Sequence, residues 1–320
     1  MQPTHFVPPD LQTLTAILTS LLIENGSSKG QLTVVRREPS IQGTFPKEIV
    51  TCRLSDGREI RLFCKYAGGH NYDTHGHRGG VAHEVKVYRK LLQPMQVSAP
   101  AVQGIYADRT TGEIWLILEY LDESVRVTTS PNTAAMCLAA RWIGQFHALN
   151  EVRLHESQML FLKSYDAEYY MGWAQRTWQY AGNLQQHFPW LKPLYEGFEK
   201  VVIALLSAPP TVIHGEYYPK NILYRDGRIY PVDWESAAIA AGEIDLASLT
   251  EGWPEDIARQ LELKYLKSRW PDGSPDEFQQ TLGAARLYLH FRWLGDRSEK
   301  ATSGWRFEQL HAAGKRIGLI

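Results

Sequence analysis

The 320-residue sequence predicts an α+β protein with two lobes, a small N-terminal lobe built on an antiparallel sheet and a larger helical C-terminal lobe. Segments with the alternating pattern of strands are concentrated in roughly the first 120 residues. Most later segments have the spacing of amphipathic helices instead. The character changes near Glu119–Glu123, so we expect an N-terminal domain of residues 1–120 and a C-terminal domain of residues 121–320.

The first element is a predicted amphipathic helix over Leu11–Ile23. Its apolar residues recur every three or four positions, at Leu11, Leu14, Ile17, Leu18 and Leu21. The segment has 13 residues with polar interruptions, which is too short to cross a bilayer. The preceding residues lack the basic and apolar stretches of a signal peptide. These features favour a protein of the cytoplasm that does not enter a membrane.

An antiparallel meander follows this helix. Strands are predicted over Gln31–Glu38, Glu48–Leu54 and Glu59–Tyr66. We expect Pro39 to end the first strand, and the Asp56-Gly57 pair to turn the chain between the next two. A helix over Val81–Gln93 and a further hairpin, "VQGIYAD" to "EIWLILEY", complete the lobe.

The second lobe begins with a predicted helix in "SPNTAAMCLAARWIGQFHAL". Ser130 is placed to cap its N-terminus and Pro131 to occupy its first position. Short strands are expected again only around residues 211–233.

Charge and cysteine content exclude some classes of function. There are 34 Lys and Arg against 35 Asp and Glu, without a basic stripe, so nothing favours nucleic-acid binding. The three cysteines form no paired metal motif and indicate reduced thiols packed as small apolar groups.

Two segments of the second lobe carry the residue types of a phosphoryl-transfer site, "HGEYYPKNIL" and "PVDWE". Phosphoryl transfer requires a held triphosphate, Mg²⁺ to neutralise its charge, and an aimed hydroxyl. Asn221 and Asp233 offer an amide oxygen and a carboxylate, ligands that suit Mg²⁺. The intervening strand, Asp226-Gly227 turn and strand would bring both side by side.

Lys65 and Glu84 form a second candidate pair. Lys65 ends the third predicted strand, where it can reach the phosphates of a nucleotide, and Glu84 follows 19 residues later in the next helix. A strand lysine held by a helix glutamate is a known arrangement for positioning phosphates. Either residue alone is more commonly a solvated surface charge.

Glu216, five residues before Asn221, is placed to accept the proton of a substrate hydroxyl. We interpret His214 as a buried structural residue that holds this loop. Asp245, at the start of a later helix, is expected to hydrogen-bond the same loop.

The combination "HGExxxxN", "VDWE" and "GEIDLA" resembles the aminoglycoside phosphotransferase and choline-kinase-like family, which shares the protein-kinase fold. The resemblance runs from about residue 30 to 255 and is weaker in the N-terminal lobe. It implies a bilobal protein-kinase-like fold, ATP or GTP, and Mg²⁺. It also implies the following roles. Lys65, Glu84, Asn221 and Asp233 serve the nucleotide and metal, Glu216 is the base, Glu119–Leu121 bind adenine, and Ser40–Thr44, including Gly43, cover the phosphates.

The chain departs from that family at Glu216, where aspartate is usual. Glu and Asp differ by about 0.4 in unperturbed pKa, so the longer side chain affects placement and not basicity. The sequence therefore favours a working kinase for a small-molecule hydroxyl. The alternatives are a nucleotide-binding pseudokinase or scaffold that has lost catalysis, and a purely structural interaction protein.

The acceptor is defined only in outline. Residues 151–320 hold 22 acids and 19 Lys and Arg, less acidic than a polycationic aminoglycoside would favour. Eight of ten Trp follow residue 150, which favours an apolar, aromatic, peptide or natural-product acceptor, although most will pack the core. Tyr217, Tyr218 and Trp253 are the candidates for a substrate pocket.

A Gly- and His-rich segment, Ala67–Gly80, precedes the Glu84 helix. Its histidines, His70, His75 and His77, and the nearby His83 lack a recognised metal spacing. We expect a mobile loop that covers the nucleotide. The sequence does not define the oligomeric state.

Overall fold

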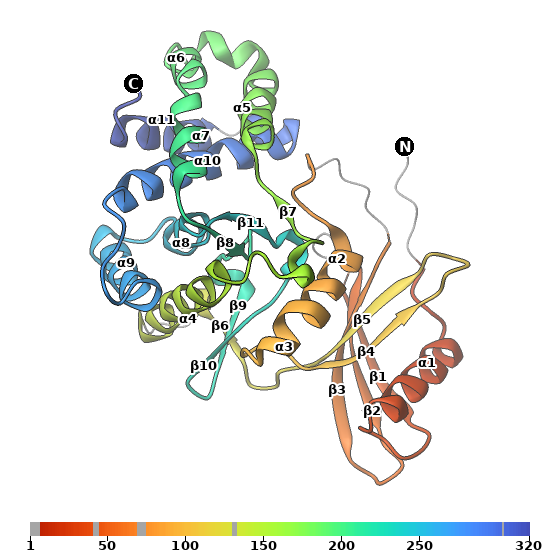
Figure 1. Cartoon of the computed structure of the whole chain (residues 1–320). Helices are drawn as coiled ribbons and strands as arrows, with labels where there is room; N and C mark the ends of the chain where they lie inside the picture. Colours follow the sequence, from red (N-terminus) through yellow and green to blue (C-terminus); the bar gives the residue numbers. More distant parts are fainter. Residues whose placement is uncertain (1–6, 41–44, 69–74, 130–132, 303) are drawn as a thin grey trace. The chain divides into compact units, whose positions relative to one another are not determined.

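The computed structural model describes residues 7–40, 45–68, 75–129, 133–302 and 304–320, and the chain divides into two compact units (Figure 1). The first, named here the sheet unit, comprises Met1–Asp73, Arg78–Val125 and Leu223–Glu235. The second, named the helical unit, comprises Thr74–His77, Arg126–Ile222 and Ser236–Ile320. Each unit is therefore assembled from segments that are distant in the sequence.

The sheet unit is built on five antiparallel strands in the order β1-β2-β3-β5-β4. Their bounds are β1 Thr33–Ser40, β2 Lys47–Arg53, β3 Glu59–Tyr66, β4 Val102–Ala107 and β5 Ile114–Glu119. Every second residue of β2 is buried, as expected for a strand with one face on a core. The register places Lys47 opposite Lys65 and Leu62 opposite Glu119. The end of β3 therefore lies in the middle of the sheet, between β2 and β5.

One predicted strand end is wrong. Pro39 does not terminate the first strand, because β1 continues to Ser40 and Pro39 lies opposite Glu48 of β2. β1 is an edge strand, and proline is tolerated there because its missing N–H is not needed by a second neighbour.

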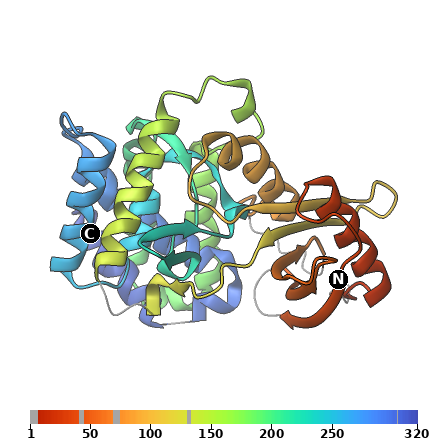
Figure 2. The same cartoon turned by 90° about the horizontal axis from the view of Figure 1, so that it is seen from below.

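Helix α1, Leu11–Glu24, supplies one side of the core of this unit. Asp10 caps it by accepting a hydrogen bond from the backbone N of Thr13 at 2.8 Å. Its leucines at positions 14, 18 and 22 are fully buried and pack with residues of β2 and β3. Figures 1 and 2 show this red helix beside the strands. The amphipathic spacing of the sequence is thus confirmed as a core contact.

The helix that follows β3 has an irregular middle. It begins as α2, Gly80–Val87, passes through a π-helical turn at Tyr88–Leu92, and ends as α3, Gln93–Met95. Glu84 is on its buried face, with 2 % exposure. A π turn adds a residue to the helix and is often found near functional positions.

The last part of the sheet unit is the hairpin of β9, Ile222–Arg225, and β10, Arg228–Pro231. These strands lie in a three-stranded sheet in the order β10-β9-β6, where β6 is Val125–Arg126. Asp226 and Gly227 both have positive φ, as a two-residue type I′ turn requires. The predicted Asp-Gly turn is confirmed, and it leads directly into Asp233.

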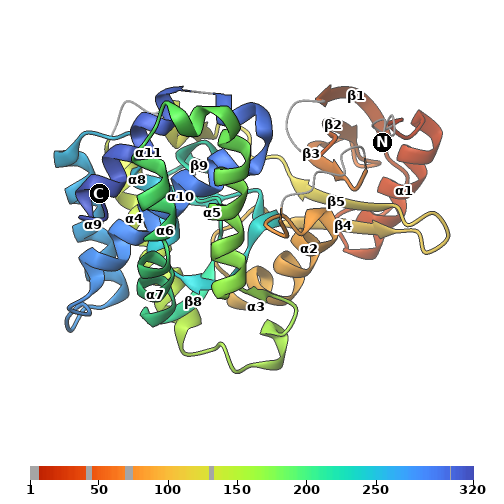
Figure 3. The same cartoon turned by 90° about the horizontal axis from the view of Figure 1, so that it is seen from above.

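The helical unit consists mainly of helices around a small sheet, β7-β11-β8. Their bounds are α4 Thr133–Glu151, α5 Ala167–Ala181, α6 Leu191–Glu196, α7 Glu199–Ser207, α8 Glu243–Thr250, α9 Glu255–Arg269, α10 Phe278–Asp296, α11 Gly304–Arg316, β7 Lys163–Ser164, β8 Pro210–Ile213 and β11 Ala238–Ala241. Helix α10 is buried on nearly all sides and packs against α5, α7, α8 and α11 (Figure 3). Groups on α10 are therefore held rigidly.

Two further points concern the helices. The predicted cap of α4 at Ser130 and Pro131 lies outside the described residues. Within the described part of the chain, no helix combines the length and apolar character needed to traverse a bilayer.

Candidate functional site

Lys65, at the end of β3, is the centre of a buried charge cluster in the sheet unit. Its Nζ donates to Oε2 of Glu84 at 2.6 Å and to Oδ1 of Asp233 at 2.5 Å, and lies 3.4 Å from Oε2 of Glu235. Lys65 itself is only 6 % exposed. The structure thus brings together three of the residues predicted from spacing alone, and adds Glu235.

The charge of Lys65 is maintained by its neighbours. Burial on its own lowers the pKa of the Lys65 ammonium, but the carboxylates of Glu84, Asp233 and Glu235 together raise it well above its ordinary value. The side chain is therefore a permanent cation, fixed in position by ion pairs on two sides. Such a point charge is suited to the oxygens of a nucleotide phosphate.

The acids around Lys65 also form a candidate metal site. One carboxylate oxygen from each of Glu84, Asp233 and Glu235 lies within 4.8 Å of the others. Arg78 also lies 3.3 Å from Glu235, so among the described residues the three acids exceed the two cations by one. Carboxylate oxygens and an excess of negative charge are what a hard divalent cation requires.

Asp233 adopts a strained backbone within this cluster. Its φ is +70°, a conformation that costs non-glycine residues about 1–3 kcal/mol and persists where the surroundings impose it. The next residue contributes to this constraint, because the backbone N of Trp234 donates to Oε1 of Glu84 at 3.2 Å. Glu84 therefore contacts both Lys65 and the segment that carries Asp233.

The remaining predicted nucleotide residues occupy separate places. Ser40 ends β1 and is half-buried, whereas Gly43 lies outside the described residues. Glu119 ends β5, and its backbone N donates to the carbonyl of Ala101 at 2.8 Å. The carbonyl of Leu121 accepts the hydroxyl of Ser124 at 2.7 Å. Their roles toward a nucleotide stay predictions.

The loop that carries Glu216 belongs to the helical unit and is held by Asp245 of α8. The Asp245 carboxylate accepts the backbone N–H groups of His214 at 2.6 Å and of Gly215 at 2.9 Å. Its Oδ2 also lies 3.2 Å from Nε2 of His147. Both His214 and Asp245 are fully buried. The expectation that Asp245 hydrogen-bonds this loop from a helix start is confirmed.

The backbone of the loop requires glycine at position 215. Gly215 has φ of +81°, and a Cβ atom there would lie 2.2 Å from the carbonyl oxygen of Ser236. The loop is closed further by Nδ1 of His214, which accepts the backbone N of Glu216 at 3.3 Å, as expected of a structural histidine. Asn221 donates through Nδ2 to the carbonyl of Glu216 at 3.1 Å. Asn221 thus holds the loop of the proposed base, whereas Asp233 belongs to the sheet unit.

The carboxylate of Glu216 lies against a histidine and an arginine. Its Oε1 is 3.3 Å from Nε2 of His77 and 3.3 Å from Nη1 of Arg292, which comes from α10. All three residues are buried, and Glu216 is 8 % exposed. Its charge is therefore compensated inside the protein.

His77 is fixed by polar contacts on both ring nitrogens. Nη1 of Arg292 lies 2.6 Å from Nε2, and since a guanidinium is only a donor, this nitrogen is the acceptor. The other nitrogen, Nδ1, lies 3.1 Å from the hydroxyl of Tyr169 on α5 and 3.2 Å from that of Tyr165. The prediction of a mobile covering loop is wrong for His77. The sequence did not show its partners, and His70 lies outside the described residues.

The three aromatic residues predicted to line a pocket divide into different environments. Tyr217 is fully buried and donates to the carbonyl of Ala139 at 3.0 Å, so it belongs to the core and the pocket prediction is wrong for it. Tyr218 is half-buried, and its hydroxyl accepts hydrogen bonds from Nη2 of Arg292 and from Nε1 of Trp293. Burial raises the pKa of Tyr218 to about 12, so it stays protonated.

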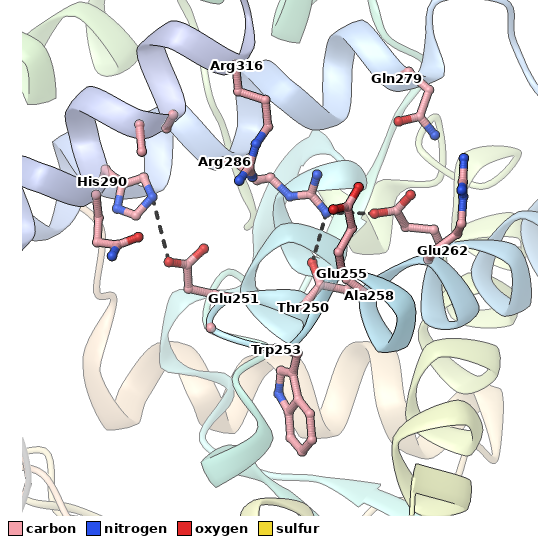
Figure 4. Close-up of a pocket in the computed structure, with 15 residues that line it drawn as sticks. Thr250, Glu251, Trp253, Glu255, Ala258, Glu262, Gln279, Arg286, His290 and Arg316 are labelled. Carbon is pink, nitrogen blue, oxygen red and sulfur yellow. Dashed lines mark hydrogen bonds and ion pairs between the residues drawn. The ribbon is translucent and has the colours of Figure 1, made fainter.

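Trp253 does line a cavity, of about 660 Å³, in the helical unit. The cavity is bounded by residues 250–253 and by faces of α9, α10 and α11 (Figure 4). Arg286 spans it, donating to Oε1 of Glu262 at 2.7 Å and to the hydroxyl of Thr250 at 3.4 Å. On the other side of the view, Nε2 of His290 lies 3.7 Å from Oε1 of Glu251.

The buried side chain of His290 should make the free energy of unfolding depend on pH. Burial lowers its pKa from 6.5 to about 4, and Arg306 and Arg316 add to this effect. Between these pH values the unfolded chain binds a proton that the folded protein excludes, so stability falls as pH falls from 6.5 to 4. We expect a loss of about 3 kcal/mol from this group. Urea unfolding across this range should show the loss reduced in His290→Gln. Exposed His187→Gln serves as control, and equal slopes in all three proteins would contradict the prediction.

Three residues of these sites were not identified from the sequence as functional candidates. Glu235 follows Asp233 by two positions and was available in the "VDWE" segment. His77 was visible only as one of several histidines. Arg292 lies 76 residues beyond Glu216 on a helix with no motif, so no pattern of spacing could connect them.

The comparisons with known proteins bear on the whole chain. The family model described as the phosphotransferase enzyme family matches residues 72–294. A choline kinase structure from Cryptosporidium parvum Iowa II aligns with a TM-score of 0.66 at 14 % identity, covering 97 % of this chain and 98 % of that one. A choline kinase from Streptococcus pneumoniae aligns with a TM-score of 0.61 at 13 % identity, covering 97 % and 99 %.

A GDP complex of an aminoglycoside 2′-phosphotransferase mutant aligns with a TM-score of 0.61 at 14 % identity, covering 94 % of this chain and 96 % of that one. A search of curated protein sequences gives no match. The structural matches confirm the predicted bilobal, protein-kinase-like α+β fold. The family model spans well over half of the sequence, and the chain therefore belongs to the phosphotransferase enzyme family.

Proposed function

We propose that this protein is a cytoplasmic, Mg²⁺-dependent kinase that transfers the γ-phosphoryl group of ATP (or GTP) to a hydroxyl group of a small molecule. The observation that carries the proposal is the cluster of Lys65 with Glu84, Asp233 and Glu235 in the sheet unit. Burying Lys65 against three carboxylates costs desolvation energy that the ion pairs offset only in part, so the cluster is better explained by ligand binding than by stability. A nucleotide with a divalent cation would use both the lysine and the acids.

Within this proposal each residue has one task. The ammonium of Lys65 binds phosphate oxygens, and Glu84 keeps it in place. Asp233 is the metal ligand, and the amide oxygen of Asn221 is proposed as another. Glu235 shares the negative charge of the site. Bound Mg²⁺ would neutralise the phosphates.

The other nucleotide contacts are proposed from the resemblance of the sequence to the phosphotransferase family. The backbone of Glu119–Leu121 would take the adenine, and the segment Ser40–Thr44 would cover the phosphates. Glu216 would orient the acceptor hydroxyl and accept its proton. In a loose transition state this proton moves late, so a glutamate side chain, longer than the usual aspartate, is tolerated at position 216.

The test is a product assay by mass spectrometry with ATP or GTP, Mg²⁺ and an extract of metabolites, accompanied by thermal denaturation. We expect a phosphorylated product and a nucleotide- and Mg²⁺-dependent rise in melting temperature. Asp233→Asn should lower the rate about 100-fold or more, because the metal loses a charged ligand. Asp226→Asn, in the exposed turn of the same hairpin, is the matched control. Absence of any nucleotide-dependent shift would refute the proposal.

A second candidate is a nucleotide-binding scaffold without phosphoryl transfer. It is favoured by one observation, that Glu216 is 8 % exposed and engaged by Arg292. A scaffold would keep the nucleotide-dependent shift while every acceptor fails. Product formation by the parent protein separates the two. In a kinase, Glu216→Gln should then abolish the product and leave the nucleotide-dependent shift.

A further inference from the structure

The proposed base is paired with a fixed cation, and both belong to the helical unit. Nη1 of Arg292 lies 3.3 Å from Oε1 of Glu216, with exposures of 4 % and 10 % for the two side chains. Burial opposes the charge of Arg292, but its neighbours, Tyr218 and Glu216 first, raise its pKa overall. Because α10 is buried on nearly all sides, this guanidinium cannot swing away into solvent.

This ion pair is poorly formed compared with another in the same chain. Arg37 binds Glu48 through two nitrogens and two oxygens, each at 2.7 Å. Arg292 instead reaches a single oxygen of Glu216, at 3.3 Å, and its other hydrogen bonds go to Nε2 of His77 and the hydroxyl of Tyr218, neither of which is an anion. Its buried Nε has no hydrogen-bond partner among the residues that the structure describes. A buried donor without an acceptor is unfavourable, so Arg292 retains unused capacity for an anion.

A second arginine adds positive charge near the same residues. The guanidinium of Arg306 lies 5.7 Å from the ring of Trp293, whose Nε1 donates to the hydroxyl of Tyr218 at 2.6 Å. Tyr218 in turn accepts from Arg292. A cationic acceptor at Glu216 would meet a carboxylate that is already neutralised and a cation that cannot move. An anionic acceptor would meet a guanidinium whose single anionic partner is held by one long contact.

We propose that the acceptor is a hydroxy compound carrying a carboxylate or phosphate group, which pairs with Arg292 and thereby frees Glu216 to act as the base. The inference rests on the proposed kinase function. In the transfer, the acceptor hydroxyl oxygen forms a bond to the γ-phosphorus while the bond to the β-phosphate oxygen breaks. The nucleoside diphosphate leaves, and the hydroxyl proton passes to Glu216. Arg292 is thus a specificity-determining residue, and quaternary amines and polycations are excluded.

The first experiment measures binding without nucleotide, so that its result does not depend on catalysis. Calorimetry would compare glycerate, shikimate and glucose 6-phosphate with choline, ethanolamine and kanamycin. We expect at least one anion to bind, at least about tenfold more tightly than any of the cations. Tighter binding of a cation, or no binding by any of the three anions, overturns the inference. If anions bind but ATP and Mg²⁺ give no product with them, the kinase function fails instead.

The second experiment changes Arg292. Arg292→Gln should weaken anion binding about 10- to 100-fold, as expected for losing a charged hydrogen bond, and leave the nucleotide affinity unchanged. Arg292→Lys keeps the charge without the planar fork and should lose less. It also serves if the glutamine variant does not fold. Arg141→Gln, at an exposed position of α4, is the control. Unchanged selectivity between anions and cations in both Arg292 variants would contradict the proposal.

Discussion

Replacement of Lys65 by methionine is expected to weaken Mg²⁺–nucleotide binding about 100-fold or more and to reduce any phosphoryl transfer by a similar or larger factor. The ammonium is the one cation that contacts Glu84, Asp233 and Glu235 together among the described residues. Methionine fills a similar volume but leaves two nearly inaccessible carboxylates, Glu84 and Glu235, without their central partner. Removing one member of a buried ion pair costs about 3–5 kcal/mol, so stability should fall as well.

The effect on binding and the effect on stability need separate measurements. Calorimetric titration with ATP and Mg²⁺ gives the first, and urea unfolding without ligand gives the second. Lys65→Arg retains the charge and should recover part of the stability. Lys86→Met, at an exposed position of α2, is the matched control and should change neither quantity. A methionine variant that still binds the nucleotide as tightly as the parent would show that the cluster is not the phosphate site.

Gly215→Ala adds a single methyl group beside Glu216, and we expect it to lower the stability of the protein more than any other methyl group added near Glu216. At φ of +81° any side chain is strained, and the new Cβ would lie 2.2 Å from the backbone oxygen of Ser236. A backbone atom cannot rotate away as a flexible side chain can. The loop must therefore shift, and the amides of His214 and Gly215 would lose their fit to Asp245. We expect a loss of about 3 kcal/mol or more in unfolding free energy.

Gly252→Ala provides the comparison. Gly252 belongs to the same unit and has nearly the same φ, +77°, but a Cβ there meets no atom within 4 Å. Gly252→Ala therefore measures the backbone strain alone, about 1–2 kcal/mol, without the steric clash that Gly215→Ala adds. Urea unfolding of both variants measures the difference. Equal losses in the two would mean that the contact with Ser236 is relieved by a small movement and does not constrain the loop.

The sequence predicted the individual helices and strands, and it predicted contacts between elements that are neighbours along the chain. Alternation gave the bounds of β3 without error, and the Asp-Gly pair gave the turn before Asp233. The pairing of Lys65 with Glu84 followed from a lysine at the end of a strand and an acid in the next helix, 19 residues later. In each of these cases the residues are close together in the sequence, so the chain between them restricts how far apart they can lie in the fold.

Contacts that join distant segments were not predictable in this way. Arg292 comes from a helix whose sequence shows only that it is buried, and nothing in its neighbours indicates which carboxylate it meets. Tyr217 was taken for a pocket residue because it adjoins Glu216, but successive residues of an extended segment point to opposite sides. Its hydroxyl and ring instead contact α4. The positions of both Arg292 and Tyr217 are set by the packing of elements that are distant in the sequence, and no local sequence pattern encodes that packing.

The discontinuous make-up of the sheet unit has a consequence for the order of biosynthesis. Lys65 and Asp233 are separated by 168 residues, although they share an ion pair. A ribosome that adds roughly 5–20 residues per second synthesises Asp233 about 10–30 s after Lys65. During that interval the nascent chain holds Lys65 and Glu84 but neither Asp233 nor Glu235. The cluster around Lys65 is therefore completed late in translation, when about half of the helical unit has been made.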